Sequence, residues 1–311
     1  MPERAGLSNE RTVYLNGDYV PESQATVHVH DRGFIFGDAV FDTARTFAGE
    51  IYRLKEHVDR LYRSLRYLQI DPGLDRHQMM AISEEVVARN QHLLGPDEDY
   101  WVFQRVTRGS YLPDGPGARS GPTVIVLCVP LPLKERAGHF RDGIDVVIPT
   151  TRRSPPDTLS PNAKTNNYLN LIVAGLETAS SSPDAWPMLL DSRGFLSEGN
   201  GSNIFLVRDG CVMTPKEQYV LAGVSRQVVI DLCGTLKLPF RENDLTLYDV
   251  ATAEEAFITS TSLCMCPVRS FDGTGLENSA VPGPITGRLM EAFREEVGHD
   301  FVRQYLAHLN D

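Results

Sequence analysis

Apolar and polar residues alternate along several stretches of the first half of the chain. Residues 12–15 and 19–20 flank Asn-Gly-Asp at 16–18, a pattern that favours a β-hairpin. Residues 25–30 also alternate, as does the second half of 31–47. These periods of two predict a hairpin and two further extended segments.

Helical periodicity comes next along the chain. In residues 54–68, leucine and valine recur at spacings of four, three, four and three, which predicts an amphipathic helix. We expect a second helix at 76–94, a strand rich in valine and aromatic residues at 100–107, and another strand at 124–129. The intervening residues 108–121 are rich in glycine and proline and are therefore expected to form a loop.

The best candidate for a domain boundary is the proline-containing stretch after these strands. It predicts an N-terminal α/β domain at 1–129, a linker at 130–136 and a C-terminal domain at 137–311. The second domain opens with an extended segment at 144–148 and ends in an amphipathic helical region at 284–309. The predicted fold class is mixed α/β with two domains.

Composition narrows the class of protein. The chain has 311 residues, 41% of them hydrophobic, which is enough for one large or two medium domains with a substantial core. No apolar run reaches the roughly 18 residues that a membrane-spanning helix needs. Residues 1–6 lack the features of a signal peptide. We therefore expect a cytoplasmic protein with no membrane partner.

Charge and cysteine content exclude further classes. The net charge of -11 argues against a nucleic-acid partner. The five cysteines are an odd number without metal-ligand spacing, which argues against a disulfide framework or a zinc site. His28 and His30 would face the same way in a strand, but no third ligand lies near them in the sequence, so we expect no metal.

Lys164 is the first candidate for chemistry. It lies among uncharged residues at 160–171, with no other lysine or arginine within ten positions. A lysine reacts with a carbonyl only when its amine is neutral, a state that burial or a nearby positive charge promotes. A lone lysine is more often an exposed surface residue. Its assignment therefore depends on residues further along the chain, above all Glu198 before a run of Gly, Ser and Asn.

Two motifs together resemble the class IV, or fold type IV, pyridoxal-phosphate aminotransferases. They are Ala163-Lys164-x-x-Asn167-x-Leu169 and Leu196-Ser197-Glu198-Gly199-x-x-Ser202-Asn203-Ile204-Phe205. This family includes branched-chain and D-amino-acid transaminases, (R)-selective amine transaminases and aminodeoxychorismate lyase. The resemblance runs from about residue 14 to about residue 272. It implies a smaller N-terminal and a larger C-terminal domain with the cofactor between them.

The resemblance also implies the cofactor and the residues that bind it. Lys164 would hold pyridoxal 5'-phosphate as a Schiff base and later move the proton, and Glu198 would lie beside the pyridine nitrogen. The motifs His57-x-x-Arg60-Leu61 and Gly223-Val224-Ser225-Arg226 resemble the phosphate-binding segments. The implied cofactor-binding residues are Arg60, Lys164, Glu198, Ser202, Asn203, Val224, Ser225 and Thr261. Without the motifs, each would be read as a surface, capping or turn residue.

The substrate side is implied by a segment at 31–47 that resembles the family's Asp-Arg-Gly-x-x-[Phe/Tyr]-Gly-Asp-x-x-[Phe/Tyr]. The phenylalanines could equally be ordinary core residues. The candidate substrate-binding residues are Phe36, Phe41, Thr43, Arg45, Phe103, Arg119 and Ser262.

The family's usual carboxylate-binding signatures are absent. Residues 101–103 read Trp-Val-Phe where branched-chain enzymes carry Tyr-x-Arg, and 113–115 read Pro-Asp-Gly where D-amino-acid enzymes carry Arg-x-His. Arg45, Arg108 or Arg119 would supply a substitute positive charge, and each could instead be structural.

The resemblance implies a transaminase that moves an amino group between an amine or amino acid and a 2-oxo acid by a ping-pong mechanism. The spacing Lys-x-x-Asn is more like D-amino-acid enzymes, so we favour an (R)-amine or D-amino-acid donor. A branched-chain L-amino-acid transaminase is one alternative. Aminodeoxychorismate lyase is another, because Phe41-x-Thr43-Ala44-Arg45 resembles its sequence. A non-catalytic binding protein is the third. A homodimer is expected from the family.

Overall fold

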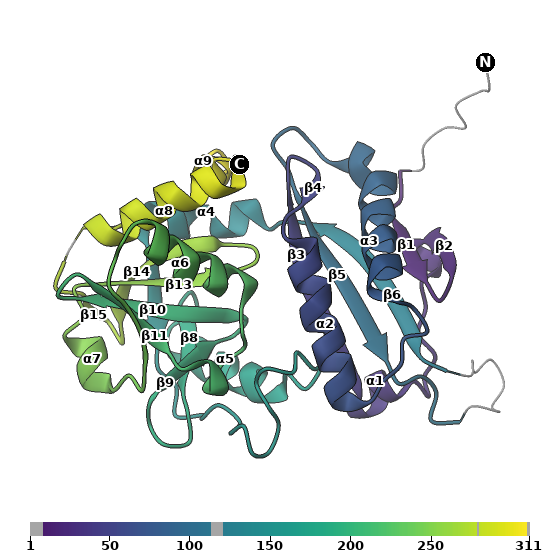
Figure 1. Ribbon diagram of the computed structural model, residues 1–311, viewed down its shortest axis with the longest axis horizontal. Helices are drawn as coiled ribbons and strands as arrows, with labels where there is room; N and C mark the ends of the chain where they lie inside the picture. The colour runs from purple at the N-terminus through teal and green to yellow at the C-terminus, as the bar shows by residue number, and fades with distance from the viewer. Residues whose placement is uncertain (1–8, 113–120, 279, 310–311) are drawn as a thin grey trace. The chain divides into compact units, whose positions relative to one another are not determined.

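The computed structural model describes residues 9–112, 121–278 and 280–309 (Figure 1). The chain divides into two compact units, which we call unit 1 (1–131 with 163–167) and unit 2 (132–162 with 168–311). The division falls within the segment predicted as a linker. Helix α4 (Leu133–Asp142) begins directly after Pro132, so the second half of the predicted linker is helical.

Unit 1 contains a six-stranded antiparallel sheet in the order β2-β1-β6-β5-β3-β4. The hairpin and the three longer strands follow the alternation of the sequence. The strands are β1 (Thr12–Leu15), β2 (Asp18–Pro21), β3 (Ala39–Phe47), β4 (Glu50–Ile51), β5 (Tyr100–Thr107) and β6 (Thr123–Pro130).

Helices α2 (Leu54–Leu68) and α3 (Arg76–Asn90) cover one face of this sheet (Figure 1). Their apolar residues, among them Leu61 and Leu65, join Val40 and Ala44 of β3 in the core of unit 1. The shorter helices of the unit are α1 (Arg32–Phe36), η1 (Glu22–Gln24) and η2 (Gln91–Leu93).

The expectation for residues 25–30 was wrong in part, because this segment forms no strand. The His28 carbonyl accepts a hydrogen bond from the amide of Asp31 at 2.9 Å, which closes a turn. The Asp31 side chain then accepts from the Gly33 amide and caps helix α1. Turn and cap hydrogen bonds therefore determine the conformation of this segment, despite its alternating sequence.

Unit 2 is built on a nine-stranded sheet in the order β12-β11-β10-β13-β14-β7-β8-β9, with β15 paired to β14. Strand β9 pairs with both β8 and β10, so six of the strands form a closed circuit. The strands are β7 (Ile144–Val147), β8 (Trp186–Leu190), β9 (Leu196–Gly199), β10 (Ser202–Arg208), β11 (Cys211–Pro215), β12 (Phe240–Asn243), β13 (Glu255–Ser260), β14 (Cys264–Phe271) and β15 (Thr274–Gly275).

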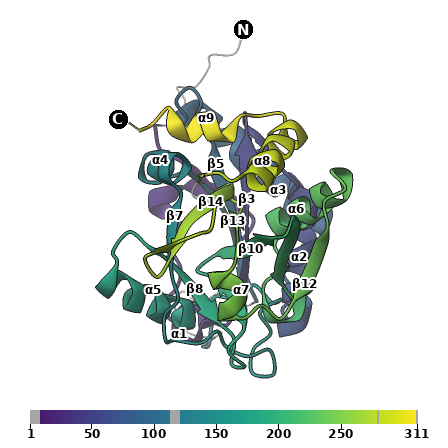
Figure 2. The ribbon, with the colours of Figure 1, turned by 90° about the vertical axis from the view of Figure 1, so that its left-hand side faces the viewer.

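The C-terminal helices of unit 2 pack on this sheet and on α4, as Figures 1 and 2 show. Phe140 of α4 stacks on Tyr305 of α9 with their ring centroids 4.4 Å apart. The remaining helices are α5 (Leu169–Ser181), η3 (Glu217–Tyr219), α6 (Val224–Thr235), α7 (Leu247–Ala251), α8 (Pro284–Val297) and α9 (Phe301–Leu306).

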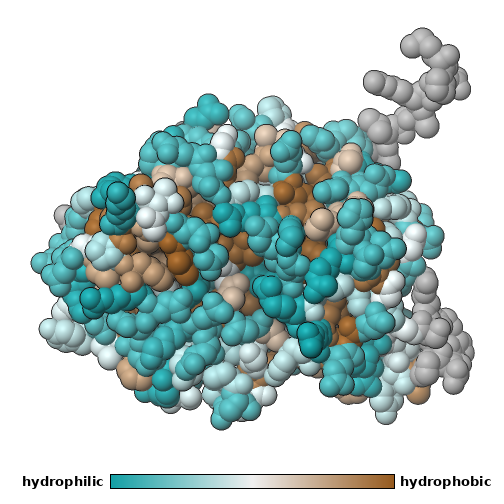
Figure 3. All heavy atoms as spheres, viewed as in Figure 1, coloured by the Kyte–Doolittle hydropathy of each residue, from teal (hydrophilic) through white to brown (hydrophobic). Residues whose placement is uncertain are grey.

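Hydrophilic side chains occupy most of the face shown in Figure 3, with hydrophobic residues between them. Within the described part of the chain, no helix is both long and apolar enough to span a membrane.

A buried ion pair lies within the sheet of unit 1. The Arg45 guanidinium lies 3.6 Å from the Asp99 carboxylate and 4.1 Å from the centroid of the Phe47 ring. The same carboxylate accepts a hydrogen bond from the Thr46 hydroxyl at 2.6 Å. Both charged side chains are almost fully buried, so each depends on the other for compensation of its charge.

Asp99→Asn is therefore expected to destabilise unit 1, because it leaves the Arg45 charge buried with a neutral partner. The expected loss is about 3 kcal/mol of unfolding free energy, measured by urea unfolding followed by circular dichroism. Asp18→Asn is the control, because it makes the same change at an exposed position of β2. Equal unfolding midpoints for the two variants would contradict the expectation.

Candidate active site

Lys164 belongs to unit 1, although its neighbours on both sides of 163–167 belong to unit 2. Its carbonyl accepts a hydrogen bond from the Phe41 amide at 3.0 Å, and its amide donates to the Ser64 hydroxyl at 3.0 Å. The Nζ atom lies 4.6 Å from the centroid of the Phe41 ring. Strand β3 and helix α2 thus fix both the backbone and the side chain of the lysine.

Arg60 lies on α2 in the same unit and forms a buried two-point ion pair. Its Nε and Nη2 atoms donate to the two oxygens of Asp42 at 2.8 and 2.7 Å. Asp42 also lies 2.7 Å from His57 Nδ1. This geometry holds the guanidinium in one orientation.

The ionisation of this cluster is set by burial and charge. Burial favours a higher pKa for Asp42, but the positive charge of Arg60 and the hydrogen bonds from His57 and Arg60 hold that pKa well below its usual value. Burial lowers the pKa of His57, against the opposing effect of Asp42. At neutral pH the cluster therefore contains an ionised aspartate, an arginine cation and a neutral histidine.

Ser64 connects the two candidate residues of unit 1. Its hydroxyl donates to the Arg60 carbonyl at 3.1 Å and accepts from the Lys164 amide at 3.0 Å. A serine on the buried face of α2 thus places the lysine segment against the turn of helix that carries the arginine. The structure therefore brings Lys164, Arg60 and Phe41 together.

Glu198 lies on β9 of unit 2 and is only 5% exposed, unlike a solvated turn residue. One carboxylate oxygen accepts from Arg153 Nε at 2.8 Å, and the other accepts from the Leu221 amide at 2.8 Å. A buried carboxylate with these two donors is compensated and fixed in orientation.

Ser202 and Asn203 open the neighbouring strand β10. The Ser202 hydroxyl accepts from the Trp186 indole at 3.0 Å, and the Asn203 amide donates to the Leu221 carbonyl at 3.0 Å. Gly223 packs so close to Asn203 that an added Cβ would lie 2.2 Å from its Oδ1 atom. These contacts fix the turn that leads from Glu198's partner Leu221 into helix α6.

The first turn of α6 carries Val224 and Ser225, and its N-cap residue Gly223 makes no side-chain cap. The Ser225 hydroxyl donates to the Ser260 carbonyl at 3.2 Å, and the Ser260 and Ser262 hydroxyls lie 3.3 Å apart. We call these three residues the serine row. Thr261 lies inside it, so the row and the helix N-terminus together offer hydroxyl groups and a partial positive charge to an anion.

Of the candidates on the substrate side, Phe41, Thr43 and Phe103 lie on strands of unit 1, and Phe36 lies on helix α1. Thr43 and Phe103 are direct partners in the pairing of β3 with β5. By the alternation of β3, Phe41 and Thr43 point away from the face that α2 covers. Phe36 is 53% exposed on α1, with its ring 5.8 Å from that of Tyr111.

The arginines proposed as substitute anchors have other partners. Arg45 forms the buried pair with Asp99, and Arg108 binds Asp38 and the carbonyls of Leu68 and Gln69. Arg119 lies outside the described residues.

Two arginines of unit 2 were not among the sequence candidates. Arg153 pairs with Glu198, and Arg136 donates to the Ser262 hydroxyl. Arg153 lies far from Glu198 in the sequence, and Arg136 lies in the predicted linker. No local motif indicated either contact.

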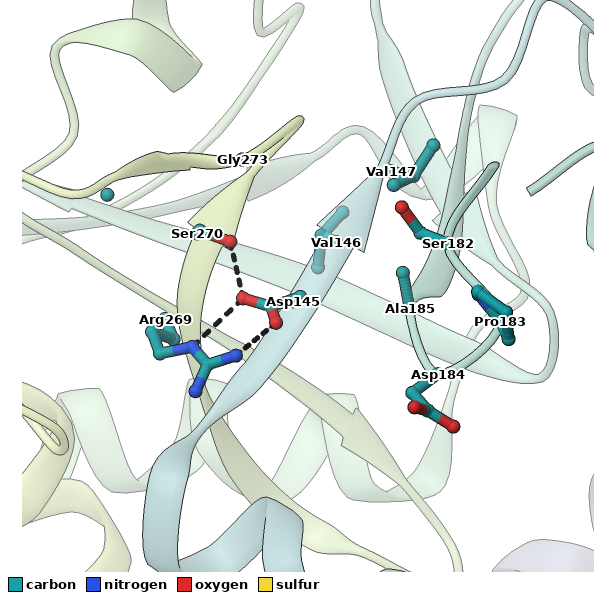
Figure 4. A pocket seen from close by; sticks show the side chains of 11 residues that line it. Asp145, Val146, Val147, Ser182, Pro183, Asp184, Ala185, Arg269, Ser270 and Gly273 are labelled. Atoms are coloured by element: carbon teal, nitrogen blue, oxygen red, sulfur yellow. Dashed lines mark hydrogen bonds and ion pairs between the residues drawn. The ribbon is translucent and has the colours of Figure 1, made fainter. Parts of the chain in front are cut away.

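A cavity of about 580 Å³ lies elsewhere in unit 2 (Figure 4). One wall is a cluster in which Arg269 and Ser270 both donate to Asp145. The opposite wall is formed by residues 182–185. No candidate site residue lines this cavity.

Each unit carries groups of the kind that pyridoxal phosphate needs. Unit 1 supplies an amine and an arginine, and unit 2 supplies a buried carboxylate and a helix N-terminus with adjacent hydroxyls. Among residues 9–112, 121–278 and 280–309, no three His, Cys, Asp or Glu side chains gather as metal ligands would.

Comparisons with known proteins give a consistent picture. The family model for amino-transferase class IV matches residues 39–271. A Methanocaldococcus jannaschii protein named "Putative branched-chain-amino-acid aminotransferase" is 38% identical over 285 residues, which are 91% of this chain and 95% of that protein. The D-alanine aminotransferase of Bacillus licheniformis is 28% identical over 286 residues, which are 92% of this chain and 96% of that protein.

Solved structures agree. The branched-chain amino acid aminotransferase of Thermobaculum terrenum, in its PLP form, matches with a TM-score of 0.81 and 26% identity. The match covers 96% of this chain and 97% of the other. The family resemblance and the predicted two-domain fold type IV architecture are thus confirmed. The chain belongs to the class IV aminotransferases, which are pyridoxal-phosphate-dependent enzymes.

Proposed function

We propose that this enzyme transfers an amino group between an α-amino acid with an apolar side chain and a 2-oxo acid, and that Lys164 holds its pyridoxal phosphate. The observation that carries this proposal is the placement of the Lys164 amine over the Phe41 ring, together with the bond from the Lys164 backbone amide to Ser64, which in turn bonds the backbone of Arg60. A lysine whose backbone is fixed in this way and whose amine lies on an aromatic ring is positioned to act as a nucleophile.

Residues of both units would take part in binding the cofactor phosphate. In unit 1, Arg60 would bind the cofactor phosphate while Asp42 keeps the guanidinium oriented. In unit 2, Ser225 and Thr261 would add hydroxyl donors at the N-terminus of α6. Ser202, Asn203 and Val224 would position these groups.

Proton handling would rest on Lys164 and Glu198. When bound, the cofactor supplies an electron-withdrawing ring that stabilises negative charge on the substrate carbon. Glu198 would accept a hydrogen bond from the ring nitrogen, because its carboxylate is buried and held by Arg153 and the Leu221 amide. The Lys164 amine would carry a proton to and from the substrate carbon.

For the donor we favour a branched-chain L-amino acid. The support is the 38% identity to the Methanocaldococcus jannaschii relative and the presence of Phe41 and Phe103 on the paired strands β3 and β5. A D-amino acid is the second candidate, supported by the similarity to D-alanine aminotransferase and by the Lys164-x-x-Asn167 spacing. The same aromatic residues would serve as walls for an (R)-amine donor.

We also propose a homodimer. Helix α5 buries Leu171 and Ala174 against its own unit but exposes apolar residues on its other side. We call the exposed set the α5 stripe: Leu169, Ile172, Val173 and Leu176. These positions recur at i, i+3, i+4 and i+7, as the buried face of a helix does. An exposed stripe of this kind marks an interaction surface.

The donor is tested by visible absorption of the purified protein saturated with pyridoxal phosphate. L-Leucine is expected to convert the spectrum of the lysine-bound cofactor into that of its aminated form, and a 2-oxo acid to restore it. D-Alanine and (R)-1-phenylethylamine are tested in separate cuvettes. Conversion by D-alanine alone would replace the first candidate with the second. Release of pyruvate from aminodeoxychorismate without an acceptor would identify a lyase instead.

Lys164→Ala is expected to abolish the spectrum of the lysine-bound cofactor and to lower turnover at least about 100-fold, since it removes the proton carrier. Lys134→Ala is the control, because that lysine is exposed on α4. A lysine-bound spectrum that survives in Lys164→Ala would overturn the assignment.

The dimer is tested by sedimentation velocity. Leu176→Glu places a charge on the α5 stripe, where Leu176 is 67% exposed, and is expected to weaken self-association at least about tenfold. Leu247→Glu on α7 is the control, because it makes the same change at an exposed leucine outside the stripe. A monomeric parent protein would refute the homodimer, and a dimer unaffected by Leu176→Glu would locate its interface elsewhere.

A further inference from the structure

An aminotransferase that acts on amino acids needs a positive group for the carboxylate shared by the amino acid and the 2-oxo acid. The family's usual anchors are absent from this sequence. In unit 1, Arg45 and Arg108 are engaged by carboxylates of their own unit, Asp99 and Asp38. Arg105 of unit 1 lies over the Phe41 and Phe103 rings, 5.1 and 5.5 Å from their centroids. Unit 2 offers further candidate arginines.

Arg136 lies on α4 and donates from Nη1 to the hydroxyl of Ser262. Its guanidinium carbon lies 5.6 Å from the centroid of the Trp186 ring. Ser262 is only 4% exposed, and its carbonyl accepts from the Tyr305 hydroxyl at 2.8 Å. Since Tyr305 is itself fully buried, the turn that receives Arg136 is held firmly in place.

The serine row connects Arg136 to the proposed phosphate site. Ser225 in the first turn of α6 bonds to Ser260, and the Ser260 and Ser262 hydroxyls are 3.3 Å apart. Arg136 bonds to the far end of the row. A ligand whose phosphate lies at Ser225 would therefore extend along the row toward a guanidinium.

The surroundings of Arg136 suit recognition of a carboxylate. Burial lowers the pKa of the guanidinium, with Tyr305 and Cys266 opposing this effect. An arginine remains charged even so, and a charge removed from water binds an anion more strongly than an exposed one does. Its planar fork can make two parallel hydrogen bonds to one carboxylate. The Trp186 ring would limit the access of water to that contact.

We propose that Arg136, assisted by Ser262, binds the carboxylate common to the amino-acid donor and the 2-oxo acid acceptor. This inference rests on the proposed function, because it assumes that the substrates carry a carboxylate. It makes Arg136 a specificity-determining residue that the sequence motifs do not include.

The test uses holoenzyme of the parent protein, Arg136→Gln and Arg136→Lys. The unreactive probe is 4-methylvalerate, which carries a carboxylate and an apolar chain but no amino group, and its Kd is measured by titration of the cofactor absorbance. Arg136→Gln is expected to raise this Kd, and KM for the amino acid and the 2-oxo acid, by about 10- to 100-fold. Arg136→Lys is expected to recover part of the loss, because it keeps the charge without the fork.

Two controls separate recognition from folding. Arg208→Gln removes a guanidinium of unit 2 that bonds to Asp249 and Thr252 instead of the serine row, and is expected to leave the Kd unchanged. Cofactor occupancy and thermal midpoint are measured for every variant. If Arg136→Gln does not fold, Ser262→Ala replaces it and is expected to raise the Kd about threefold, as loss of one hydrogen bond would.

The outcomes distinguish this inference from the function on which it rests. A parent protein that transaminates no amino acid would refute the proposed function. If the parent is active and Arg136→Gln keeps its cofactor, an unchanged Kd for 4-methylvalerate would overturn the role of Arg136. A rise in Kd accompanied by an equal loss of cofactor would also overturn it, since the residue would then be structural.

Discussion

The hydrogen bonds between strand β3 and residues 163–167 determine where the proposed reactive lysine lies. Phe41 donates to the Lys164 carbonyl, and Asn166 donates to the Ala39 carbonyl at 2.9 Å. A bridge between Val40 and Thr165 completes the pairing. Backbone pairing of this kind fixes both the position of the segment and the direction of its side chains. The position of Lys164 is therefore set by strand β3, which lies more than 100 residues earlier in the chain.

Helix α2 reinforces that pairing through charge. Asp42 points from β3 toward α2, where Arg60 and His57 meet it. An ionised carboxylate can remain buried there only because a cation and a hydrogen-bond donor compensate it. The strand and the helix are thus joined at the same level at which the lysine segment docks, through Ser64. The residues of α2 that compensate Asp42 and the residue that holds the lysine segment thus lie on neighbouring turns of one helix.

Local patterns in the sequence were sufficient for most elements. The period of α2 and the alternation of β3 and β5 appear directly in the residues, because each buries one face of a regular element. Residues 25–30 also alternate but form no strand, because turn and cap hydrogen bonds around Asp31 take precedence. The motifs around Lys164 and Glu198 indicated the family, which the comparisons confirmed.

Such local patterns did not indicate contacts between residues that are distant in the sequence. Arg153 meets Glu198 from 45 positions away, and Arg136 meets Ser262 from 126 positions away. Neither arginine stands in a recognisable motif, because its role is defined by the fold and not by its neighbours in sequence. The same holds for Asp99, which lies directly before β5 and pairs with Arg45 of the neighbouring strand β3. Local patterns therefore indicated candidate residues for the site but not the distant residues that contact them.

The assignment of 163–167 to unit 1 has a consequence for modularity. Unit 2 supplies the chain on both sides of this segment, so the polypeptide passes from one unit to the other at three points. A fragment ending at Leu131 would contain β3 without Lys164, and a fragment beginning at Pro132 would contain Lys164 without the strand that positions it. The two units therefore cannot be exchanged between proteins as separate fragments. The proposed reactive lysine lies in the sequence between segments of unit 2, but it packs in unit 1.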